Sequence, residues 1–466
     1  MGERFDLVVL GGGSAARDAA IMAMREYDAR VAVVERERWG GSCPNVACSP
    51  TKAYLVAAEL THDVNWRAPV LGIETGPARV DLARVRAWKE SLKRTQEEWV
   101  RDLEAAGLTP ISGQATFIGP HALRVGEREL EADRILVATG SRTAVPPVEG
   151  IEDIDWLDHV SALDLTEVPR SLLVVGGGAV GLEFGQVFAR FGARVRIVDA
   201  AERIAPLADA DASATLAAAL QAEEIELTTN VFVQRLRQEG DEVVATIAPR
   251  DGSEPYERRA ERVLLASGRV PNVEELDLEA VGVETTRSGI TVDEHLRTSA
   301  PGIWAAGDVT AVAQFTPIAQ YQGRVALADM FRKDAPAADY SVLPTAIFTD
   351  PELGSVGLTE EQAREDHDVD VVRNERVKRF QFVGAEHGLF KVVFDRGSRK
   401  VLGLHVVSRS ASEIVQGFSL GLRLDATVDD LARMHHVFPT FGEGVKAAAE
   451  RAVPSMAELV DSGFMD

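Results

Sequence analysis

The chain has two cysteines in 466 residues, Cys43 and Cys48, and they lie five positions apart. On a short helical turn, two cysteines at this spacing can approach closely enough for a disulfide. Such a pair can exchange electrons with an adjacent redox group and with an outside acceptor, because a thiolate is a reactive nucleophile. The alternative is that both are small buried apolar side chains, the usual fate of intracellular cysteines. Two cysteines are too few for a disulfide-stabilised scaffold.

A glycine-rich turn precedes the cysteines and indicates what lies beside them. The apolar run 5–10 leads into Gly11-x-Gly13-x-x-Ala16, a predicted helix over 14–27 and a strand over 30–35. The glycines permit a tight turn and close approach of the backbone to a pyrophosphate at the helix N-terminus. Glu35 ends the second strand, 24 residues after Gly11, where a carboxylate can accept hydrogen bonds from a ribose. We predict a dinucleotide site here.

The same strand-turn-helix-strand pattern recurs later in the chain. A strand over 172–175 precedes Gly176-x-Gly178-x-x-Gly181, and the next strand ends at Asp199, 23 residues after Gly176. An acid at this position favours the free 2′-hydroxyl of NADH and repels the 2′-phosphate of NADPH. Arg203 follows nearby and could meet a phosphate, although a solvated turn residue is the simpler interpretation. Two dinucleotide sites suggest that one dinucleotide is held permanently and the other is exchanged.

The rest of the chain completes an α/β architecture. One long amphipathic helix is predicted over 78–107, and buried strands leave their sheets at Thr139-Gly140 and at Gly268. A third strand of this kind ends in Gly307-Asp308, which places a carboxylate at a sheet edge. From residue 339 the pattern changes to alternating strands, among them 389–394 and 401–407, followed by helices from Ser410 onward, which predicts an α+β region.

Composition limits the partners and the location. The net charge is −23, which argues against nucleic acid or an anionic membrane as a partner because both would repel the chain. No apolar run approaches the ~18 residues of a spanning helix. The N-terminus lacks the basic and apolar segments of a signal peptide, so we expect a cytoplasmic protein.

Together these motifs resemble the class I pyridine nucleotide–disulfide oxidoreductases, the family of glutathione reductase, dihydrolipoamide dehydrogenase and mercuric reductase. The resemblance runs essentially end to end, and the run from Gly40 through Cys43 and Cys48 to Lys52 is its most specific part. It implies two Rossmann-like domains for FAD and NAD(P) and a C-terminal dimerisation domain, hence a homodimer. The implied segments are FAD-binding over 1–150 and 271–338, NAD(P)-binding over 151–270 and dimerisation over 339–466.

The resemblance also implies roles for individual residues. Cys48 would be the charge-transfer thiol against the flavin and Cys43 the interchange thiol that faces the substrate. Lys52 would pair with Glu183 near the reactive nitrogen of the flavin, although a structural salt bridge is compatible with this. Glu35 would bind the adenosine ribose of FAD, Asp308 the ribityl side, and no residue is assigned as a metal ligand. The predicted dinucleotide-binding residues are Gly11, Gly13, Ala16, Glu35, Gly41, Thr139, Gly140, Gly307 and Asp308 for FAD and Gly176, Gly178, Gly181, Asp199 and Gly268 for NADH.

One departure from the family pattern bears on the acceptor. Disulfide reductases of this family carry His-x-His-Pro-Thr-x-x-Glu, whose second histidine is the acid/base for the interchange thiol across the dimer interface. This chain has His436-Val-Phe438-Pro-Thr-Phe-Gly-Glu443, so phenylalanine stands in place of the base. Removing a general base typically costs ~10²–10⁴-fold in rate. His436 could substitute if it faces the same side, and the alternative is a polar turn at the surface.

The sequence therefore predicts an FAD enzyme that passes electrons from NADH through Cys43 and Cys48 to an acceptor at the dimer interface. Mercuric reductases also lack the histidine, and the segment from Glu443 to Lys446 resembles theirs, which favours a metal ion. Residues 460–466 lack the cysteine pair that mercuric reductases use, which pulls the other way. The alternatives are a small disulfide handled without the usual base, a quinone or dye, a redox-sensing flavoprotein, and a simple flavin reductase.

Overall fold

The computed structural model describes residues 2–454 and 456, so residues 460–466 lie outside the described part of the chain. The chain forms two compact units. Unit 1 comprises residues 1–52, 87–144 and 268–339, and unit 2 comprises residues 53–86, 145–267 and 340–466. The four-part division at residues 150, 270 and 338 stays a prediction. None of the helices in the described residues is long and apolar enough to cross a membrane.

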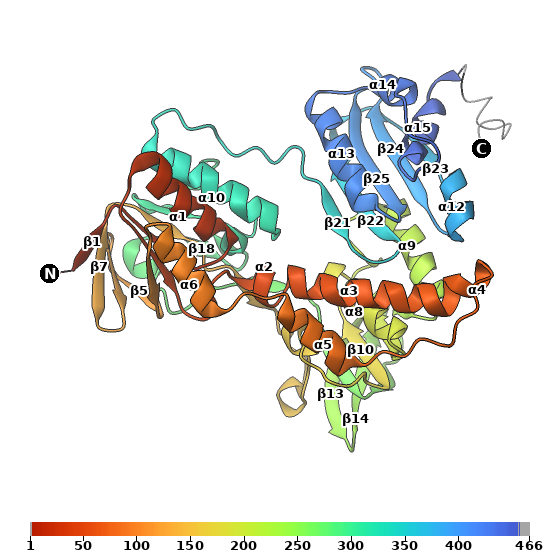
Figure 1. The fold of residues 1–466 in the computed structure, drawn as a ribbon, viewed down its shortest axis with the longest axis horizontal. Helices are drawn as coiled ribbons and strands as arrows, with labels where there is room; N and C mark the ends of the chain where they lie inside the picture. Colours follow the sequence, from red (N-terminus) through yellow and green to blue (C-terminus); the bar gives the residue numbers. More distant parts are fainter. Residues whose placement is uncertain (1, 455, 457–466) are drawn as a thin grey trace. The chain divides into compact units, whose positions relative to one another are not determined.

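Unit 1 is built on a parallel five-stranded sheet. Its strand order is β20 (Ile303–Ala305), β8 (Ile135–Val137), β2 (Leu7–Leu10), β3 (Val31–Glu35) and β4 (Thr109–Ser112). The strands are continuous apolar runs because both faces of such a sheet are covered. Helix α1 (Ser14–Tyr27) packs beside α10 (Thr316–Phe331), as Figure 1 shows, although 300 residues of sequence lie between their starts.

Smaller sheets complete unit 1. The four-stranded sheet has the order β1 (Glu3–Phe5), β7 (Arg128–Ala132), β6 (Ala122–Val125) and β5 (Ala115–Gly119). Two-stranded sheets pair β9 (Ser141–Thr143) with β17 (Arg269–Pro271) and β18 (Thr285–Thr286) with β19 (Gly289–Ile290). Short helical turns occur over Ser42–Asn45 (α2), Glu279–Val281 and Asp308–Thr310.

The prediction of one long helix over 78–107 is wrong. The structure has α5 (Leu82–Ser91) and α6 (Gln96–Ala105), separated by residues 92–95. The Thr95 side chain accepts a hydrogen bond from the Glu98 amide, and the Glu98 side chain accepts one from the Thr95 amide. This capping box satisfies the free amides of a new helix start, so the chain ends one helix and begins another.

Unit 2 contains the second copy of the strand-turn-helix-strand pattern. Its parallel sheet has the order β12 (Glu226–Thr228), β11 (Arg194–Val198), β10 (Ser171–Val175) and β16 (Arg262–Leu265). Helices α8 (Ala179–Arg190) and α9 (Ala210–Ala222) belong to this region, as do α7 (His159–Ala162) and a turn over Ile151–Asp153. An antiparallel sheet of β13 (Val231–Glu239), β14 (Glu242–Pro249) and β15 (Tyr256–Ala260) follows.

The C-terminal part of unit 2 is the predicted α+β region. Its antiparallel sheet has the order β21 (Thr345–Ile347), β22 (Glu352–Gly357), β25 (Val401–Ser408), β24 (Leu389–Asp395) and β23 (Val369–Asn374). Helix α13 (Ala411–Arg423) packs on β22 and β25 (Figure 1). The other helices are α11 (Glu360–Asp366), α12 (Lys378–Val383), α14 (Val428–Arg433) and α15 (Glu443–Glu450).

Helix α3 (Cys48–His62) continues as a π-helical turn (Asp63–Arg67) and α4 (Ala68–Val70).

Candidate active site

The first glycine turn forms a cradle beside the carboxylate group of Glu35. Gly11 has φ +110°, and a Cβ there would lie 2.2 Å from the Ala138 carbonyl oxygen, so no larger residue fits. Glu35 accepts a hydrogen bond from the Gly12 amide at 2.6 Å. The amides at the start of α1 have no side-chain cap, which leaves them available to an anion. Gly13 and the buried Ala16 therefore stand where a pyrophosphate-binding turn needs them.

The second glycine turn repeats this geometry. Gly176 has φ +118°, and a Cβ there would lie 2.3 Å from the Ala266 carbonyl oxygen. Asp199 accepts hydrogen bonds from the Gly177 amide and from the Ala201 amide. Gly178 precedes α8 without a side-chain cap, as Gly13 precedes α1. A Cβ at Gly181 would lie 1.9 Å from the Gly176 carbonyl oxygen, so helix and turn touch there. The internal repeat predicted from sequence is confirmed.

The carboxylate of Asp308 lies among side chains that the sequence motifs did not reveal. Ser141 donates a hydrogen bond to Asp308 at 2.5 Å, and Arg269 donates to the Ser141 hydroxyl at 2.7 Å and lies 3.6 Å from the carboxylate. Gly307, with φ +82°, donates its amide to the buried Gln322 side chain at 2.7 Å. Ser141 lies 167 positions from Asp308 and 128 positions from Arg269, so spacing alone could not show these contacts.

Thr139 and Gly140 follow strand β8 and lie in unit 1, as Asp308 does. The Thr139 hydroxyl donates to the Asn272 carbonyl at 2.6 Å, and the Asn272 side chain donates back to the Thr139 carbonyl. Gly140 and Gly268 have φ values of +69° and +127°, and the Ala144 amide donates to the Gly268 carbonyl. Gly268 was predicted for the NADH group, but it belongs to unit 1 with these FAD-group residues, whereas Asp199 belongs to unit 2.

The two cysteines lie on different helical elements next to the first glycine turn. Cys43 is on α2, and Cys48 begins α3. Gly41, with φ +72°, approaches the turn so closely that a Cβ there would lie 2.5 Å from the Gly13 Cα. The segment is fixed by Asn45, whose side chain donates to the carbonyls of Trp39 and Gly41. The cysteines are thus held beside the dinucleotide cradle, with Cys48 exposed and Cys43 half-buried.

The two thiols differ in acidity. A hydrogen bond donated by the Cys43 thiol lowers the pKa of Cys48 to about 6. The Thr316 hydroxyl and the Lys52 ammonium act in the same direction, and partial desolvation of the sulfur, which remains open to solvent on one side, opposes them. The same hydrogen bond, together with burial, raises the pKa of Cys43 above its ordinary value. The position of Cys48 at the first residue of α3 also favours its thiolate. In the reduced pair, Cys48 is the thiolate and Cys43 keeps its proton.

Replacing Thr316 tests this assignment. The Thr316 hydroxyl, at the start of α10, lies 3.5 Å from the Cys48 sulfur. We expect Thr316→Val to move the thiolate titration to higher pH, because the thiolate loses a hydrogen-bond donor, whereas Thr316→Ser should leave it in place. The measurement is the rate of iodoacetamide alkylation of the reduced protein against pH, with the labelled cysteine identified by mass spectrometry. An unchanged profile in Thr316→Val would contradict the assignment.

Lys52 and Glu183 fall in different units, so their pairing stays a prediction. Within unit 2 the Glu183 side chain is buried and accepts a hydrogen bond from the Phe348 amide at 3.0 Å. Glu183 on α8 therefore holds the residue that follows β21 in the C-terminal region. Within unit 1 the Lys52 ammonium favours the thiolate of Cys48.

The segment that stands in place of the family's histidine motif carries exposed apolar side chains. Phe438 is 68% exposed and Val437 76% exposed. His436 is partly buried and stacks on Phe418 with ring centroids 6.1 Å apart. Burial, together with the nearby Lys446 charge, lowers the pKa of His436 and favours its neutral form. Whether His436 acts as a base stays a prediction, since its ring packs within its own chain.

Glu443, the last residue of the motif, begins α15. Its carboxylate is 3.5 Å from the Thr440 amide, and burial raises its pKa. In this chain the carboxylate closes the turn over residues 440–443, which follows Phe438 in sequence.

Residues 5–323 match the model of the pyridine nucleotide-disulphide oxidoreductase family, and residues 343–449 match that family's dimerisation domain. The chain belongs to this family. Mercuric reductases from Staphylococcus aureus and Streptomyces lividans are 34% and 35% identical to it, covering 96% and 98% of this chain and 82% and 98% of theirs. Dihydrolipoyl dehydrogenase from Thermus scotoductus is 35% identical, covering 96% of this chain and 97% of its own.

A solved structure of the same family shares the fold. The Cu(II) complex of the HOCl-induced flavoprotein disulfide reductase RclA from Escherichia coli superposes with a TM-score of 0.85 at 28% identity. The match covers 96% of this chain and 99% of that one. The chain is thus an NAD(P)H-dependent flavoprotein disulfide oxidoreductase, and its α/β fold is the predicted one.

The first cradle fits FAD on its own geometry. The glycine turn excludes side chains, the start of α1 offers uncapped amides to a pyrophosphate, and Glu35 can accept hydrogen bonds from a ribose. Bound FAD supplies the transfer of two electrons from a nicotinamide hydride to the cysteine pair. Asp308 and the glycine turn would hold the cofactor, and Cys48, whose lowered pKa favours the thiolate, would lie beside it.

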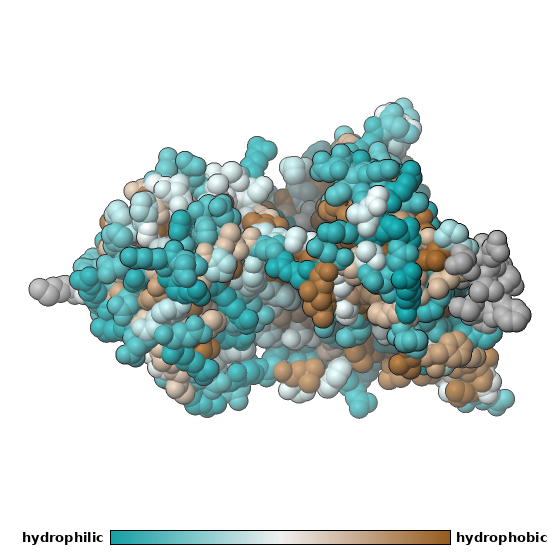
Figure 2. All heavy atoms as spheres, turned by 90° about the horizontal axis from the view of Figure 1, so that it is seen from above, coloured by the Kyte–Doolittle hydropathy of each residue, from teal (hydrophilic) through white to brown (hydrophobic). Residues whose placement is uncertain are grey.

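The dimerisation domain implies a homodimer. Figure 2 shows apolar patches on a mostly hydrophilic face of the molecule. Large exposed apolar side chains in the C-terminal region of unit 2 include Leu420, Leu424, Val437 and Phe438. Burying such side chains against a second copy would be favourable.

Proposed function

We propose that this enzyme passes electrons from NADH through FAD and the Cys43–Cys48 pair to a thiol-binding metal ion, Hg(II) or Cu(II), taken as substrate. One NADH supplies a hydride, which carries two electrons. These reduce one Hg(II) to Hg(0), or two Cu(II) to two Cu(I), and leave NAD⁺ and one proton. The observation that carries the proposal is Phe438, an exposed apolar side chain where disulfide reductases of the family have their base.

The acidities of the two thiols explain why the missing base matters for one acceptor and not the other. Cys43 keeps its proton because its pKa is raised by the hydrogen bond to Cys48 and by burial. Attack on a disulfide needs the Cys43 thiolate, so a base must first remove that proton. Phenylalanine cannot do so. A thiol-binding metal ion displaces the proton itself when it binds the sulfur, because metal binding and thiol deprotonation are coupled.

The ligand chemistry supports the same choice. Thiolates are soft ligands that favour ions such as Cu(I) and other thiophilic metals. Among the described residues, no cluster of three or more histidine, cysteine, aspartate or glutamate side chains could hold a metal ion. The mercuric reductases among the relatives support a metal acceptor, and RclA was solved as a complex with Cu(II).

A small disulfide is the second candidate. The cysteine pair is complete, Glu443 is present and dihydrolipoyl dehydrogenases are as similar in sequence as mercuric reductases are. For this candidate another group must take the proton of Cys43. His436 is near in sequence, but its ring stacks on Phe418.

A panel of acceptors distinguishes these functions. Steady-state NADH oxidation by the purified FAD-loaded enzyme is measured with Hg(II), Cu(II), lipoamide, low-molecular-weight disulfides and quinones. We expect kcat/KM for a metal ion to exceed that for every disulfide by roughly 10²-fold or more, the scale of a missing general base. Similar values for a disulfide would contradict the proposal. A single reduction by NADH without turnover on any acceptor would indicate a redox sensor instead.

The coenzyme is proposed to be NADH. The Asp199 carboxylate accepts hydrogen bonds from the Gly177 and Ala201 amides and lies at the end of β11. At this position the 2′-hydroxyl of NADH can donate a hydrogen bond to it, whereas the 2′-phosphate of NADPH is repelled. Gly176, Gly178 and Gly181 shape the turn in front of it.

A further inference from the structure

Arg203 lies in the segment that follows Asp199 and is engaged by a carboxylate from elsewhere in the chain. Its guanidinium donates to Glu361 at 2.7 Å. The neighbouring residue Ile204 lies against the glycine turn, since a Cβ at Gly177 would meet both Ile204 and the Asp199 carboxylate within 3.3 Å. The Ala205 amide also donates to the Gly177 carbonyl at 2.7 Å. Arg203 is therefore attached to the backbone beside the proposed ribose site.

The partner of Arg203 comes from the C-terminal region of the chain. Glu361 is the second residue of α11, 158 positions after Arg203. Its side chain is 58% exposed and that of Arg203 is 31% exposed. The Nε atom of Arg203 is buried and makes no hydrogen bond. The arginine thus keeps hydrogen-bonding capacity that the structure leaves unused, and a strong carboxylate partner holds its terminal nitrogen.

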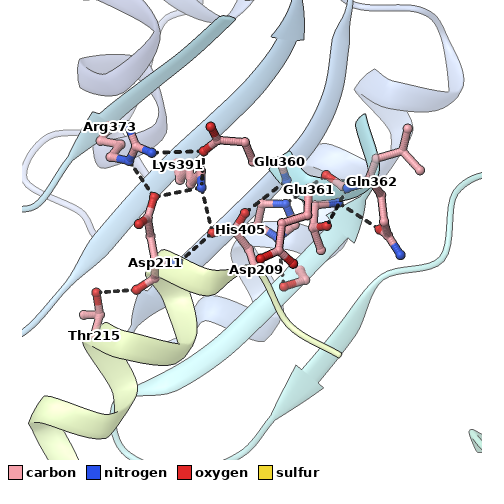
Figure 3. A network of polar contacts seen from close by, with 12 residues as sticks. Asp209, Asp211, Thr215, Glu360, Glu361, Gln362, Arg373, Lys391 and His405 are labelled. Atoms are coloured by element: carbon pink, nitrogen blue, oxygen red, sulfur yellow. Dashed lines mark hydrogen bonds and ion pairs between the residues drawn. The ribbon is translucent and has the colours of Figure 1, made fainter. Parts of the chain in front are cut away.

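An ion cluster around the buried Lys391 includes Glu360, the residue before Glu361 (Figure 3). Lys391, 1% exposed on β24, makes ion pairs with Asp209, Asp211 and Glu360 at 2.7–2.8 Å. Arg373 contacts Asp211 and Glu360 at 2.6 and 3.0 Å. Lys391 and Asp209 are both buried, so breaking their ion pair would be costly, since the remaining charge would lack its partner.

The same cluster binds the start of α11 to the coenzyme segment. Asp209 caps α9 and also accepts the Glu360 amide at 3.1 Å. Thr359 and Gln362 form a capping box at the start of α11. The two ends of the segment from Arg203 to Asp209 are therefore both attached to α11, through Glu361 and through the Glu360 amide. These contacts hold the start of α11, which carries Glu361, next to Arg203.

We infer that Glu361 is a coenzyme-specificity residue: by engaging Arg203 it withholds a cation that would otherwise bind the 2′-phosphate of NADPH. This inference rests on the NADH role proposed above for Asp199. Asp199 repels the 2′-phosphate directly, and Glu361 removes the attraction that Arg203 would offer. An arginine makes charge-assisted hydrogen bonds with phosphate, so its release should change specificity measurably.

The test is direct binding to the FAD-loaded enzyme. Isothermal titration calorimetry compares ADP-ribose with 2′-phospho-ADP-ribose, which differ only in the phosphate. We expect Glu361→Gln to tighten binding of the phosphorylated ligand about 3- to 30-fold and to leave ADP-ribose binding unchanged. The gain should shrink at high salt because the new contact is partly exposed. Glu361→Ala provides a second variant with the same expectation.

Two controls separate this inference from the proposed function. Glu365→Gln removes the same charge from α11 one turn further on, and it should leave the ratio of the two affinities unchanged. Adding Arg203→Ala to Glu361→Gln should abolish the gain. No gain in either Glu361 variant, or a gain that survives loss of Arg203, would overturn the role of Glu361 while a wild-type preference for ADP-ribose still supports Asp199. A wild-type preference for the phosphorylated ligand would contradict Asp199 and this inference together.

Discussion

Cys43→Ala should lose NADH-driven reduction of the physiological acceptor by about 10³-fold or more, the scale seen when a covalent catalytic group is removed. Flavin reduction by NADH should persist at the wild-type rate. The reason is the division of labour between the thiols: Cys48 is the thiolate beside the cofactor cradle, whereas Cys43 is the protonated thiol on α2. Loss of Cys43 leaves electrons on the flavin with no dithiol to deliver them.

The measurement has two parts. Stopped-flow absorbance follows flavin reduction by NADH under anaerobic conditions, and steady-state NADH oxidation follows turnover with each acceptor. Ser49→Ala, an exposed neighbour on α3, is the matched control and should behave as wild type. Acceptor turnover that survives in both Cys43→Ala and Cys48→Ala would show a flavin reductase that does not use its dithiol.

The second large effect is a gain of function. Phe438→His should raise turnover with lipoamide or glutathione disulfide about 10²-fold, because a histidine restores a general base of suitable pKa. Phe438 is 68% exposed, so the substitution does not open a cavity in the core of its own chain. The kcat/KM for disulfides should acquire a pH dependence with a histidine-like midpoint.

Val437→His provides the control for position. Val437 is also exposed and adjacent in sequence, but it does not occupy the position of the family's base. It should give little gain with disulfides. No gain in Phe438→His, or an equal gain in Val437→His, would mean that the missing base does not explain acceptor choice.

The elements that position the cofactors could be predicted because each is a local pattern. Glycines that no side chain can replace, an apolar strand and a terminal acid recur in both copies, and the structure gives Glu35 and Asp199 the same hydrogen bond to the glycine turn. The sequence also holds a local signal for a break within the helix predicted over 78–107. The Thr95-to-Glu98 capping box divides the predicted long helix into two.

The contacts that tune the site are non-local and could not be predicted from spacing. Thr316 reaches the Cys48 sulfur across 268 positions, and Ser141 reaches Asp308 across 167. Lys391 joins Asp209 across 182 positions, and the apolar run around Lys391 indicates a buried strand but not the acidic partner. Only the fold brings such side chains together.

The most direct test of the central claim is anaerobic re-oxidation of the two-electron-reduced enzyme. The protein is reduced with one equivalent of NADH, freed of NAD⁺, and mixed in a stopped-flow instrument with Hg(II), Cu(II) or lipoamide. We predict that a metal ion accepts the electrons about 10²-fold faster than lipoamide at equal concentration, and that Cys43→Ala abolishes this step. Faster re-oxidation by lipoamide than by either metal ion would contradict the proposed function.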